Sequence, residues 1–233
     1  MPTLFLIPTP LAPDTAGAVL TPPVADVVAR TDCFFVEELR TARRFISSLR
    51  TGRVIDETTF YELHKNTPEG DTKRQLTSLL AQGRDAGVLS EAGCPGVADP
   101  GAVAVRLAHQ LGFRVEPLVG PSSILLALMA SGMSGQSFVF HGYLPIDRAE
   151  RTRAIRQLEA DARQRQQTQI FMETPYRNNA LLADLLATAQ PATRLCIACH
   201  VTAPDALIRT QTLKQWSANV PDLHKKPTIF LLF

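Results

Sequence analysis

The stretch AGVLSEAGCPGVADPGAVAVRLAHQLG, residues 86–112, decides the fold. It opens on a short apolar run, AGVL, which has the length and character of a strand buried on both faces. It closes on apolar residues at helical spacing, with Asp99 and Pro100 as the predicted N-cap and first-turn pair and Gly112 after the last turn. A strand, a loop and a helix in this order form one unit of a parallel sheet.

The same alternation of apolar run and helical pattern covers the first half of the chain. It predicts an α/β domain over residues 1–118, with a parallel, doubly wound sheet that carries helices on both faces. The expected strands are residues 3–8, 33–38, 53–60, 86–91 and 113–120, and the expected helices are residues 22–32, 41–50, 70–83 and 99–112.

The second half predicts a second α/β domain over residues 119–233. Its late strands are joined by short connections, which suit hairpins and therefore a mixed sheet with helices. The expected helices are residues 123–132, 147–167 and 177–189, and the expected strands are residues 137–145, 168–174, 193–201, 205–213 and 228–233.

The composition is that of an ordinary globular protein with a net charge of +2. With so little net charge, nucleic-acid binding would need a local basic face. No segment reaches the roughly 18 consecutive apolar residues of a membrane span. The start, MPTLFLIPTP, lacks the basic region and the cleavage site of a signal peptide. We therefore expect a cytoplasmic protein with no membrane partner.

Two of the four cysteines, Cys196 and Cys199, lie in the segment CIACH, which formally matches a haem-attachment motif or half of a zinc ribbon. The segment belongs to the apolar run TRLCIACHV, and no second C-x-x-C motif occurs in the chain. We therefore predict that both cysteines lie in the interior of a strand and that the chain holds no metal.

The loop SEAGCPGVADPG, residues 90–101, combines glycines that allow close backbone approach with two carboxylates, Glu91 and Asp99. Two carboxylates would repel a phosphate, whereas they would bind ribose hydroxyls and a positive charge well. We interpret the loop as a site for a cationic nucleoside. For Asp99, a purely structural role as N-cap of the following helix stays open.

Ligands of open α/β sheets bind beyond the carboxyl ends of the strands, so the residues after other strands are candidates too. The turn GPSS could present backbone N–H groups or the hydroxyls of Ser122 and Ser123. Arg40 follows a strand closely and could bind a phosphate, whereas the arginines after it are interpreted as a solvated helix face. No H-E-x-x-H, G-x-S-x-G or Walker-type motif supports a hydrolase or an NTPase.

Several segments together resemble one family. GVLSEAGCPGVADPG, PLVGPSSILLALMASGM, HGYLP and IFMETPYR occur in that order over nearly the whole chain. They are similar to the signature segments of the tetrapyrrole-methylase-fold (class III) S-adenosylmethionine methyltransferases. The similarity is greatest to the branch that methylates a cytidine 2'-hydroxyl of bacterial small-subunit ribosomal RNA.

The resemblance implies two α/β domains with S-adenosylmethionine between them, a homodimer, and a role in ribosomal RNA processing with RNA as the acceptor. Residues expected at the cofactor are Pro10, Glu91, Gly93, Cys94, Ser122, Ser123 and Met172. Residues expected at the acceptor are Glu38, Arg40, Asp99, Glu173 and Arg177. A carboxylate can take the proton that a ribose hydroxyl loses, so Glu38 and Glu173 are the catalytic candidates.

The chain also departs from the family's segments, and the departures keep other functions open. Ala12 and Pro13 stand where the family has glycine and asparagine, and Glu91 stands where it has aspartate. Cys94 replaces a threonine of the family, and Tyr176 replaces a histidine. The cofactor side is kept better than the acceptor side. A methyltransferase for a tetrapyrrole or a protein side chain, and a non-catalytic module that binds S-adenosylmethionine or RNA, therefore remain alternatives.

Overall fold

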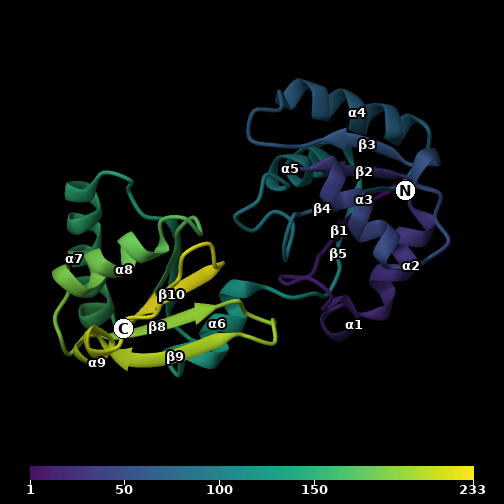
Figure 1. The fold of residues 1–233 in the computed structure, drawn as a ribbon. Coiled ribbons are helices and arrows are strands. Elements are labelled where there is room, and N and C mark those ends of the chain that lie inside the picture. Colours follow the sequence, from purple (N-terminus) through teal and green to yellow (C-terminus); the bar gives the residue numbers. More distant parts are fainter. The chain divides into compact units, whose positions relative to one another are not determined.

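The computed structural model describes residues 1–233 and divides them into two compact units, Met1–Ser122 and Ser123–Phe233 (Figure 1). The boundary predicted from the sequence lies after residue 118. Each unit has its own five-stranded sheet, which makes the chain an α/β protein, as predicted.

Unit 1 contains a parallel sheet in the order β3-β2-β4-β1-β5, as the alternation of apolar runs and helical patterns predicts. Its strands are β1 (Thr3–Ile7), β2 (Cys33–Val36), β3 (Thr59–Glu62), β4 (Ala86–Leu89) and β5 (Arg114–Pro117). Its helices are α1 (Ala16–Val19), α2 (Pro22–Arg30), α3 (Leu39–Ser48), the 3-10 turn η1 (Ile55–Glu57), α4 (Glu69–Ala81) and α5 (Ala102–Leu111).

Helices cover both faces of this sheet, so the prediction of a doubly wound domain is confirmed (Figure 1). Successive residues of β1 point to opposite faces, as the period of a strand requires. Leu4 packs in the core beneath α4 and α5, whereas Phe5 packs in the core beneath α2 and α3. Both side chains are almost fully buried.

One expected strand is wrong over most of its length. Residues 53–60 were expected to be extended, but only their last two residues belong to β3, which begins at Thr59. Before it, the carbonyl of Val54 accepts hydrogen bonds from the Thr58 hydroxyl (2.9 Å) and the Glu57 N–H (3.3 Å). These bonds close the turn η1. A threonine hydroxyl that bonds to a nearby carbonyl competes in this way with the backbone pairing of a strand.

Strand β4 lies in the centre of the sheet, between β1 and β2, and its Gly87 is required there by packing. A Cβ atom on Gly87 would lie 2.7 Å from the terminal methyl of Ile7 and 2.7 Å from a ring carbon of Phe34. Both neighbours are fully buried and have no free space to move into. The glycine therefore lets two large side chains meet over the middle strand.

Unit 2 has a mixed sheet in the order β6-β7-β10-β8-β9, as predicted from the short late connections. Strands β6 and β7 are parallel, and the other neighbours are antiparallel. The strands are β6 (Phe138–Tyr143), β7 (Thr168–Met172), β8 (Arg194–Cys199), β9 (Leu207–Thr212) and β10 (Thr228–Leu232). The helices are α6 (Ser123–Ser131), α7 (Arg148–Arg165), α8 (Asn178–Thr188) and α9 (Leu213–Ala218).

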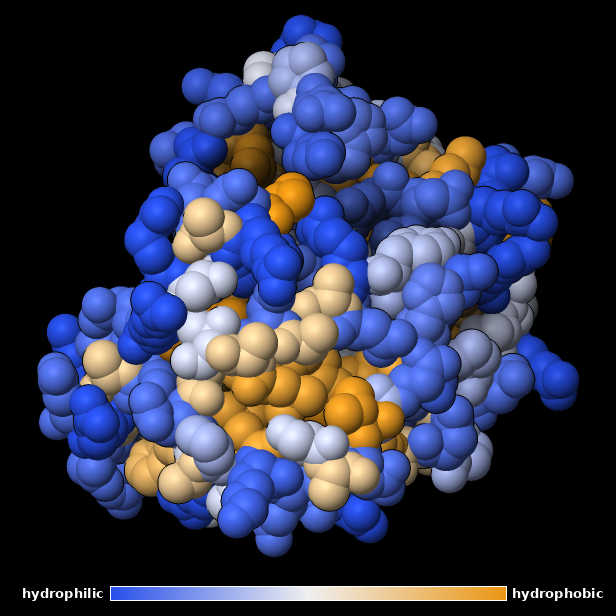
Figure 2. Space-filling view, turned by 60° about the vertical axis from the view of Figure 1, so that its left-hand side comes forward, coloured by the Kyte–Doolittle hydropathy of each residue, from blue (hydrophilic) through white to orange (hydrophobic).

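The two faces of the second sheet are covered differently. Helices α7, α8 and α9 cover one face with the larger core, whereas α6 packs against β8, β9 and β10. Helix α6 is apolar on all sides and exposes Leu125 and Met129 at 51% and 79%. In the space-filling view, apolar side chains gather in one area of an otherwise mostly hydrophilic face (Figure 2).

The two cysteines of CIACH lie within β8 and are buried, so the prediction of a strand interior is confirmed. They are three positions apart in a strand and therefore point to opposite faces. Cys199 belongs to the core beneath α7 to α9, and Cys196 does not. No group of three or more His, Cys, Asp or Glu side chains is placed to hold a metal ion. No helix is long and apolar enough to cross a membrane.

We predict that Gly87→Ala destabilises unit 1 by about 1–3 kcal/mol, because the added methyl group overpacks a filled core. The matched control is Gly70→Ala in α4, where a Cβ atom meets nothing within 4 Å. That substitution should leave stability unchanged or raise it by up to about 1 kcal/mol. Urea unfolding followed by far-ultraviolet circular dichroism measures both. Equal midpoints for the two variants would contradict the packing argument.

Candidate functional site

The loops that follow β1, β4 and β5 meet at the carboxyl end of the first sheet, and we call residues 8–10, 90–101 and 118–122 the three-loop edge. Thr9 and Gly93 exchange two backbone hydrogen bonds of 3.0 Å each, which joins the first two loops. The buried hydroxyl of Ser90 donates to the Gly93 carbonyl (2.7 Å), and the Thr9 hydroxyl donates to the Ser90 carbonyl (3.3 Å). The edge is thus held mainly by backbone groups.

The third loop joins the other two by close packing and by a thiol. A Cβ atom on Gly120 would lie only 2.3 Å from the Cβ of Pro8, so only glycine allows this approach. The Cys94 thiol donates to the Pro121 carbonyl over 3.3 Å. Burial raises the pKa of Cys94, which keeps the thiol protonated and able to donate. Cysteine therefore still supplies a donor where the related segments have threonine.

Gly93 is at the centre of this edge and has a backbone conformation that favours glycine, with φ of +81°. A Cβ atom there would also approach the side chain of Leu11 (3.1 Å) and the carbonyl of Pro121 (3.3 Å). Pro10 lies next to the Thr9–Gly93 bridge and is half-buried. Both predicted cofactor residues are thus part of the same rigid junction.

The carboxylate of Asp99 holds the loop in its folded form. One of its oxygens, Oδ1, accepts from the N–H groups of Gly96 (3.2 Å) and Gly101 (2.8 Å). Helix α5 begins at Ala102 with Gly101 as its N-cap, so the predicted N-cap and first-turn pair of Asp99 and Pro100 is wrong. The two hydrogen bonds close the loop on itself before the helix begins.

Three carboxylates beyond the carboxyl ends of β2 and β4 interact electrostatically: Glu91 and Asp99 on the three-loop edge, and Glu37 after β2. We call these three residues the acidic rim. Burial raises the pKa of Glu37, and the charges of Glu91 and Asp99 raise it further, while His64 opposes them. Glu37 and Glu91 line the same shallow depression beyond β2 and β4. Residues 37–40 follow the buried strand β2 directly, which is the position where ligands of an open α/β sheet bind.

The predicted catalytic residue Glu38 lines the same depression and is the N-cap of α3. Its carboxylate accepts from the N–H groups of Arg40 (3.0 Å) and Thr41 (2.7 Å). These hydrogen bonds lower its pKa, because they favour the ionised form. Arg40 is exposed in the first turn of α3, where its guanidinium can reach a ligand.

In unit 2, the predicted residues lie at the carboxyl end of β7. Met172 is the last residue of the strand, and the carboxylate of Glu173 follows it with a side chain only 1% exposed. Its Oε1 accepts from the Thr174 N–H (2.6 Å) and from the Arg177 guanidinium (2.6 Å). The bond to Glu173 raises the pKa of Arg177 and fixes the direction of its side chain.

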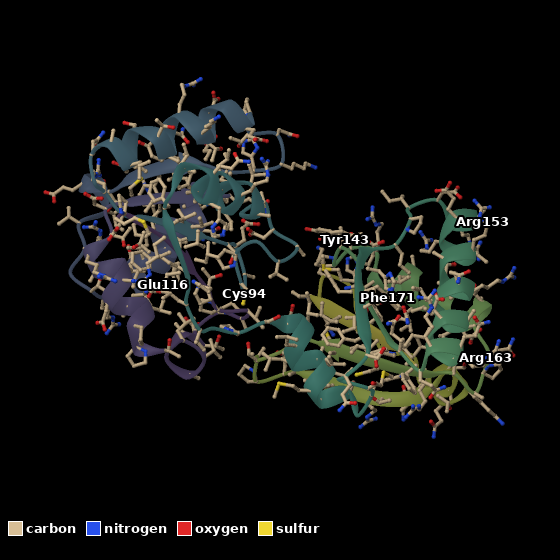
Figure 3. The ribbon with its side chains drawn as sticks, turned by 180° about the vertical axis from the view of Figure 1, so that it is seen from behind. Cys94, Glu116, Tyr143, Arg153, Arg163 and Phe171 are labelled. Atoms are coloured by element: carbon tan, nitrogen blue, oxygen red, sulfur yellow. The ribbon has the colours of Figure 1, made fainter.

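Each unit therefore brings together its own group of predicted residues. Figure 3 labels Cys94 on the loop after β4 and Tyr143 at the end of β6. Ser122 and Ser123 are half-buried, and α6 begins at Ser123. In unit 1, one edge of the sheet carries Pro10, Glu38, Glu91, Gly93, Cys94 and Asp99. In unit 2, the end of β7 carries Met172, Glu173 and Arg177.

Comparison with known proteins shows similarity over nearly the whole chain. The model of the Tetrapyrrole (Corrin/Porphyrin) Methylases matches residues 15–216. Ribosomal RNA small subunit methyltransferase I of Vibrio cholerae is 30% identical over 234 residues, covering 99% of this chain and 76% of that protein. The proteins of the same name from Mesorhizobium japonicum and Micromonospora olivasterospora are 32% and 35% identical, over 91% and 79% of this chain. The alignments span 68% and 55% of those two proteins.

Solved structures share the fold at lower sequence identity. A diphthine synthase matches with a TM-score of 0.71 and 12% identity, covering 100% of this chain and 90% of that one. The methyltransferase CobJ matches with a TM-score of 0.64 and 19% identity, covering 100% and 94%. These matches show a common fold.

The acidic rim predicts a pH-dependent effect of Glu37→Gln. The folded-state pKa of Glu37 is raised above its ordinary value of 4.5, so its contribution to stability is present below that pH and is lost as the pH rises through the raised pKa. Glutamine does not ionise, so the variant does not lose this stability as the pH rises. At about pH 7.5 the variant should therefore unfold about 1–3 °C above the wild type, and the difference should vanish below pH 4.5.

Differential scanning calorimetry at both pH values measures this effect. The control is Glu57→Gln, which removes an exposed carboxylate on η1. It should change the unfolding temperature equally little at either pH. A Glu37→Gln effect that is independent of pH would contradict the electrostatic interpretation of the rim.

Proposed function

This chain belongs to the tetrapyrrole (corrin/porphyrin) methylase family, and we propose that it transfers a methyl group from S-adenosylmethionine to a ribose 2'-hydroxyl of ribosomal RNA. The family and its relatives make the chain a methyltransferase. Ribosomal RNA as the acceptor follows from the names of three relatives at 30–35% identity. The choice of a ribose hydroxyl rests on the resemblance of the sequence segments.

The observation that carries the cofactor proposal is the acidic rim on the rigid three-loop edge. When bound, S-adenosylmethionine supplies a methyl group on a positively charged sulfur. Its ribose hydroxyls and its positive charge both suit carboxylates, because these accept hydrogen bonds and stabilise a cation. The chemistry of the edge therefore fits this cofactor. We propose as its contacts Pro10, Glu91, Gly93, Cys94, Ser122, Ser123 and Met172.

On the acceptor side, the enzyme must align the ribose oxygen with the methyl group and provide a group that takes the proton of the hydroxyl. Methyl transfer is an in-line displacement, so most of the rate gain comes from holding the acceptor oxygen in position. The ribose hydroxyl loses its proton as its oxygen is methylated, and we propose Glu38 or Glu173 as the acceptor of that proton. The lowered pKa of Glu38 keeps it ionised, and the Arg177 contact holds Glu173 in one orientation.

Cations near these carboxylates suit the phosphates of an RNA acceptor. Arg40 is exposed at the start of α3, and Arg177 keeps 38% of its side chain exposed despite its ion pair. A guanidinium group can bind two oxygens of one phosphate, so we propose both as RNA contacts, and we propose Asp99 as a further residue on the acceptor side. RNA binding should then weaken as the salt concentration rises.

We further propose a homodimer that works in the cytoplasm, where ribosomal RNA is modified. The support is the exposed apolar surface of α6, on which Leu125 is 51% and Met129 is 79% exposed. Large apolar side chains that gather on a surface are typical of protein interfaces. A monomeric mass by light scattering of the purified protein would contradict the dimer.

The first test is calorimetric titration with S-adenosylmethionine and with its product, S-adenosylhomocysteine, which lacks the positive charge on sulfur. We expect the wild type to bind both, and we expect Glu91→Ala to weaken binding about tenfold or more, the value of a hydrogen bond to a charged group. The loss should be larger for the charged ligand. The control, Glu57→Ala, removes an exposed carboxylate from η1 and should bind like the wild type. No binding by the wild type would favour a non-catalytic role.

The second test separates the two proton acceptors. Glu38→Asn keeps a good N-cap for α3, and Glu173→Gln keeps the size and one acceptor of the native side chain. For the residue that takes the proton, kcat should fall about 100-fold or more at saturating cofactor, while the Kd for S-adenosylmethionine stays unchanged. Small ribosomal subunits from a strain that lacks the gene serve as substrate. An unchanged kcat in both variants would remove this role from both residues.

A further inference from the structure

Unit 2 exposes an aromatic side chain that the methyl-transfer proposal does not use. Tyr176, in the turn after β7, is 69% exposed. The His224 ring meets it nearly edge-on, at a centroid distance of 6.1 Å and an angle of 73°, and the Lys225 ammonium lies 6.0 Å from its centroid. We propose that Tyr176, His224 and Lys225, the Tyr176 platform, stack an unpaired nucleobase of single-stranded RNA. This inference rests on the proposed RNA acceptor.

The platform is built on hydrogen bonds between two turns that are far apart in the sequence. The N–H of Lys225 donates to the carbonyl of Pro175 over 2.9 Å. The side chain of Asn178, which is fully buried, donates to the carbonyl of Lys226 over 2.7 Å. These bonds fix the turn with His224 and Lys225 against the turn with Tyr176. An aromatic surface that is held in this way loses little conformational entropy when it binds a ligand.

The charge around the platform suits a nucleic acid. The Lys225 ammonium is the cation at the Tyr176 ring, and two carboxylates in the same turns have partners of their own. Glu173 pairs with Arg177, and Asp222 accepts from the Asn179 side chain over 2.7 Å. The buried Nε of Arg177 has no partner. Two adjacent lysines, Lys225 and Lys226, supply the local positive charge that a chain with a net charge of only +2 needs for RNA.

A second exposed tyrosine extends the surface toward β6. Tyr143 is 58% exposed at the end of that strand (Figure 3). It lies close enough to Arg177 to contribute to its raised pKa, after the larger effect of Glu173. Exposed aromatic rings next to cations bind single strands, because every base offers a face for stacking. A duplex offers no such free face, so the expected ligand is an unpaired segment.

The spectroscopic test uses Tyr176→Trp. The natural Trp216 is 3% exposed, so its emission should not respond to RNA. The new indole is expected to be quenched by a single-stranded RNA of about 12 nucleotides, a length typical of stacking sites, and not by the same sequence in a duplex. A dye on the RNA reports binding independently. Bound RNA without quenching would overturn the platform, and so would the absence of any binding to RNA, which would point to a protein partner.

The affinity test asks whether the ring itself is needed. Tyr176→Ala should weaken binding of the single strand about tenfold, and Tyr176→Phe should stay within about twofold of the wild type, because stacking needs the ring and not the hydroxyl. Lys225→Ala should also weaken binding. Its matched control is Lys214→Ala, on the exposed side of α9, which should not. Equal affinities for Tyr176→Ala and the wild type would overturn the proposal.

Methyl transfer and cofactor titration on the same preparations distinguish this proposal from the proposed function. If the wild type and Tyr176→Ala both methylate small ribosomal subunits with the same KM, the platform is overturned and the proposed function stands. A wild type that binds no S-adenosylmethionine and methylates nothing would overturn the function. The quenching of the Tyr176→Trp indole by RNA then still decides the platform by itself.

Discussion

The two backbone hydrogen bonds between Thr9 and Gly93 are the constraint on which the candidate site depends. They join the loops after the neighbouring strands β1 and β4 with groups that no side-chain substitution removes. The other contacts are arranged around this bridge: the hydroxyl of Ser90, the contact of Gly120 with Pro8 and the thiol of Cys94. A ligand that approaches the edge meets a surface that is already in place, which reduces the cost of ordering it on binding.

The rigidity of the edge explains why three carboxylates can stay close to one another. Burial, and after it the like charges of Glu91 and Asp99, raise the pKa of Glu37, so its ionised form is disfavoured in the folded chain. A flexible loop would relieve the repulsion by moving apart, whereas Asp99 is bound to two N–H groups of its own loop. The molecule thus keeps an unfavourable charge arrangement that a cationic ligand would relieve.

The sequence predicted the two kinds of sheet and most elements, because the period of the apolar residues reflects which face of each element is buried. It failed where local hydrogen bonds determine the backbone, as in the turn that Val54 and Thr58 close before β3 and in the start of α5 after Asp99. In the site, it selected residues after strands but could not show that Glu38 caps a helix or that Glu173 pairs with Arg177. Those contacts depend on side-chain direction, which spacing along the chain does not specify.

The position of β10 has a consequence for the order in which the chain folds. This strand, residues 228–232, lies between β7 and β8 and separates the parallel pair β6-β7 from the hairpin β8-β9. During synthesis, the sheet of unit 2 lacks its middle strand until residue 232 has left the ribosome. Until then, β7 and β8 each keep an unpaired edge. All strands of unit 1 are complete by Pro117. The three-loop edge can therefore form while the rest of the chain is still being translated.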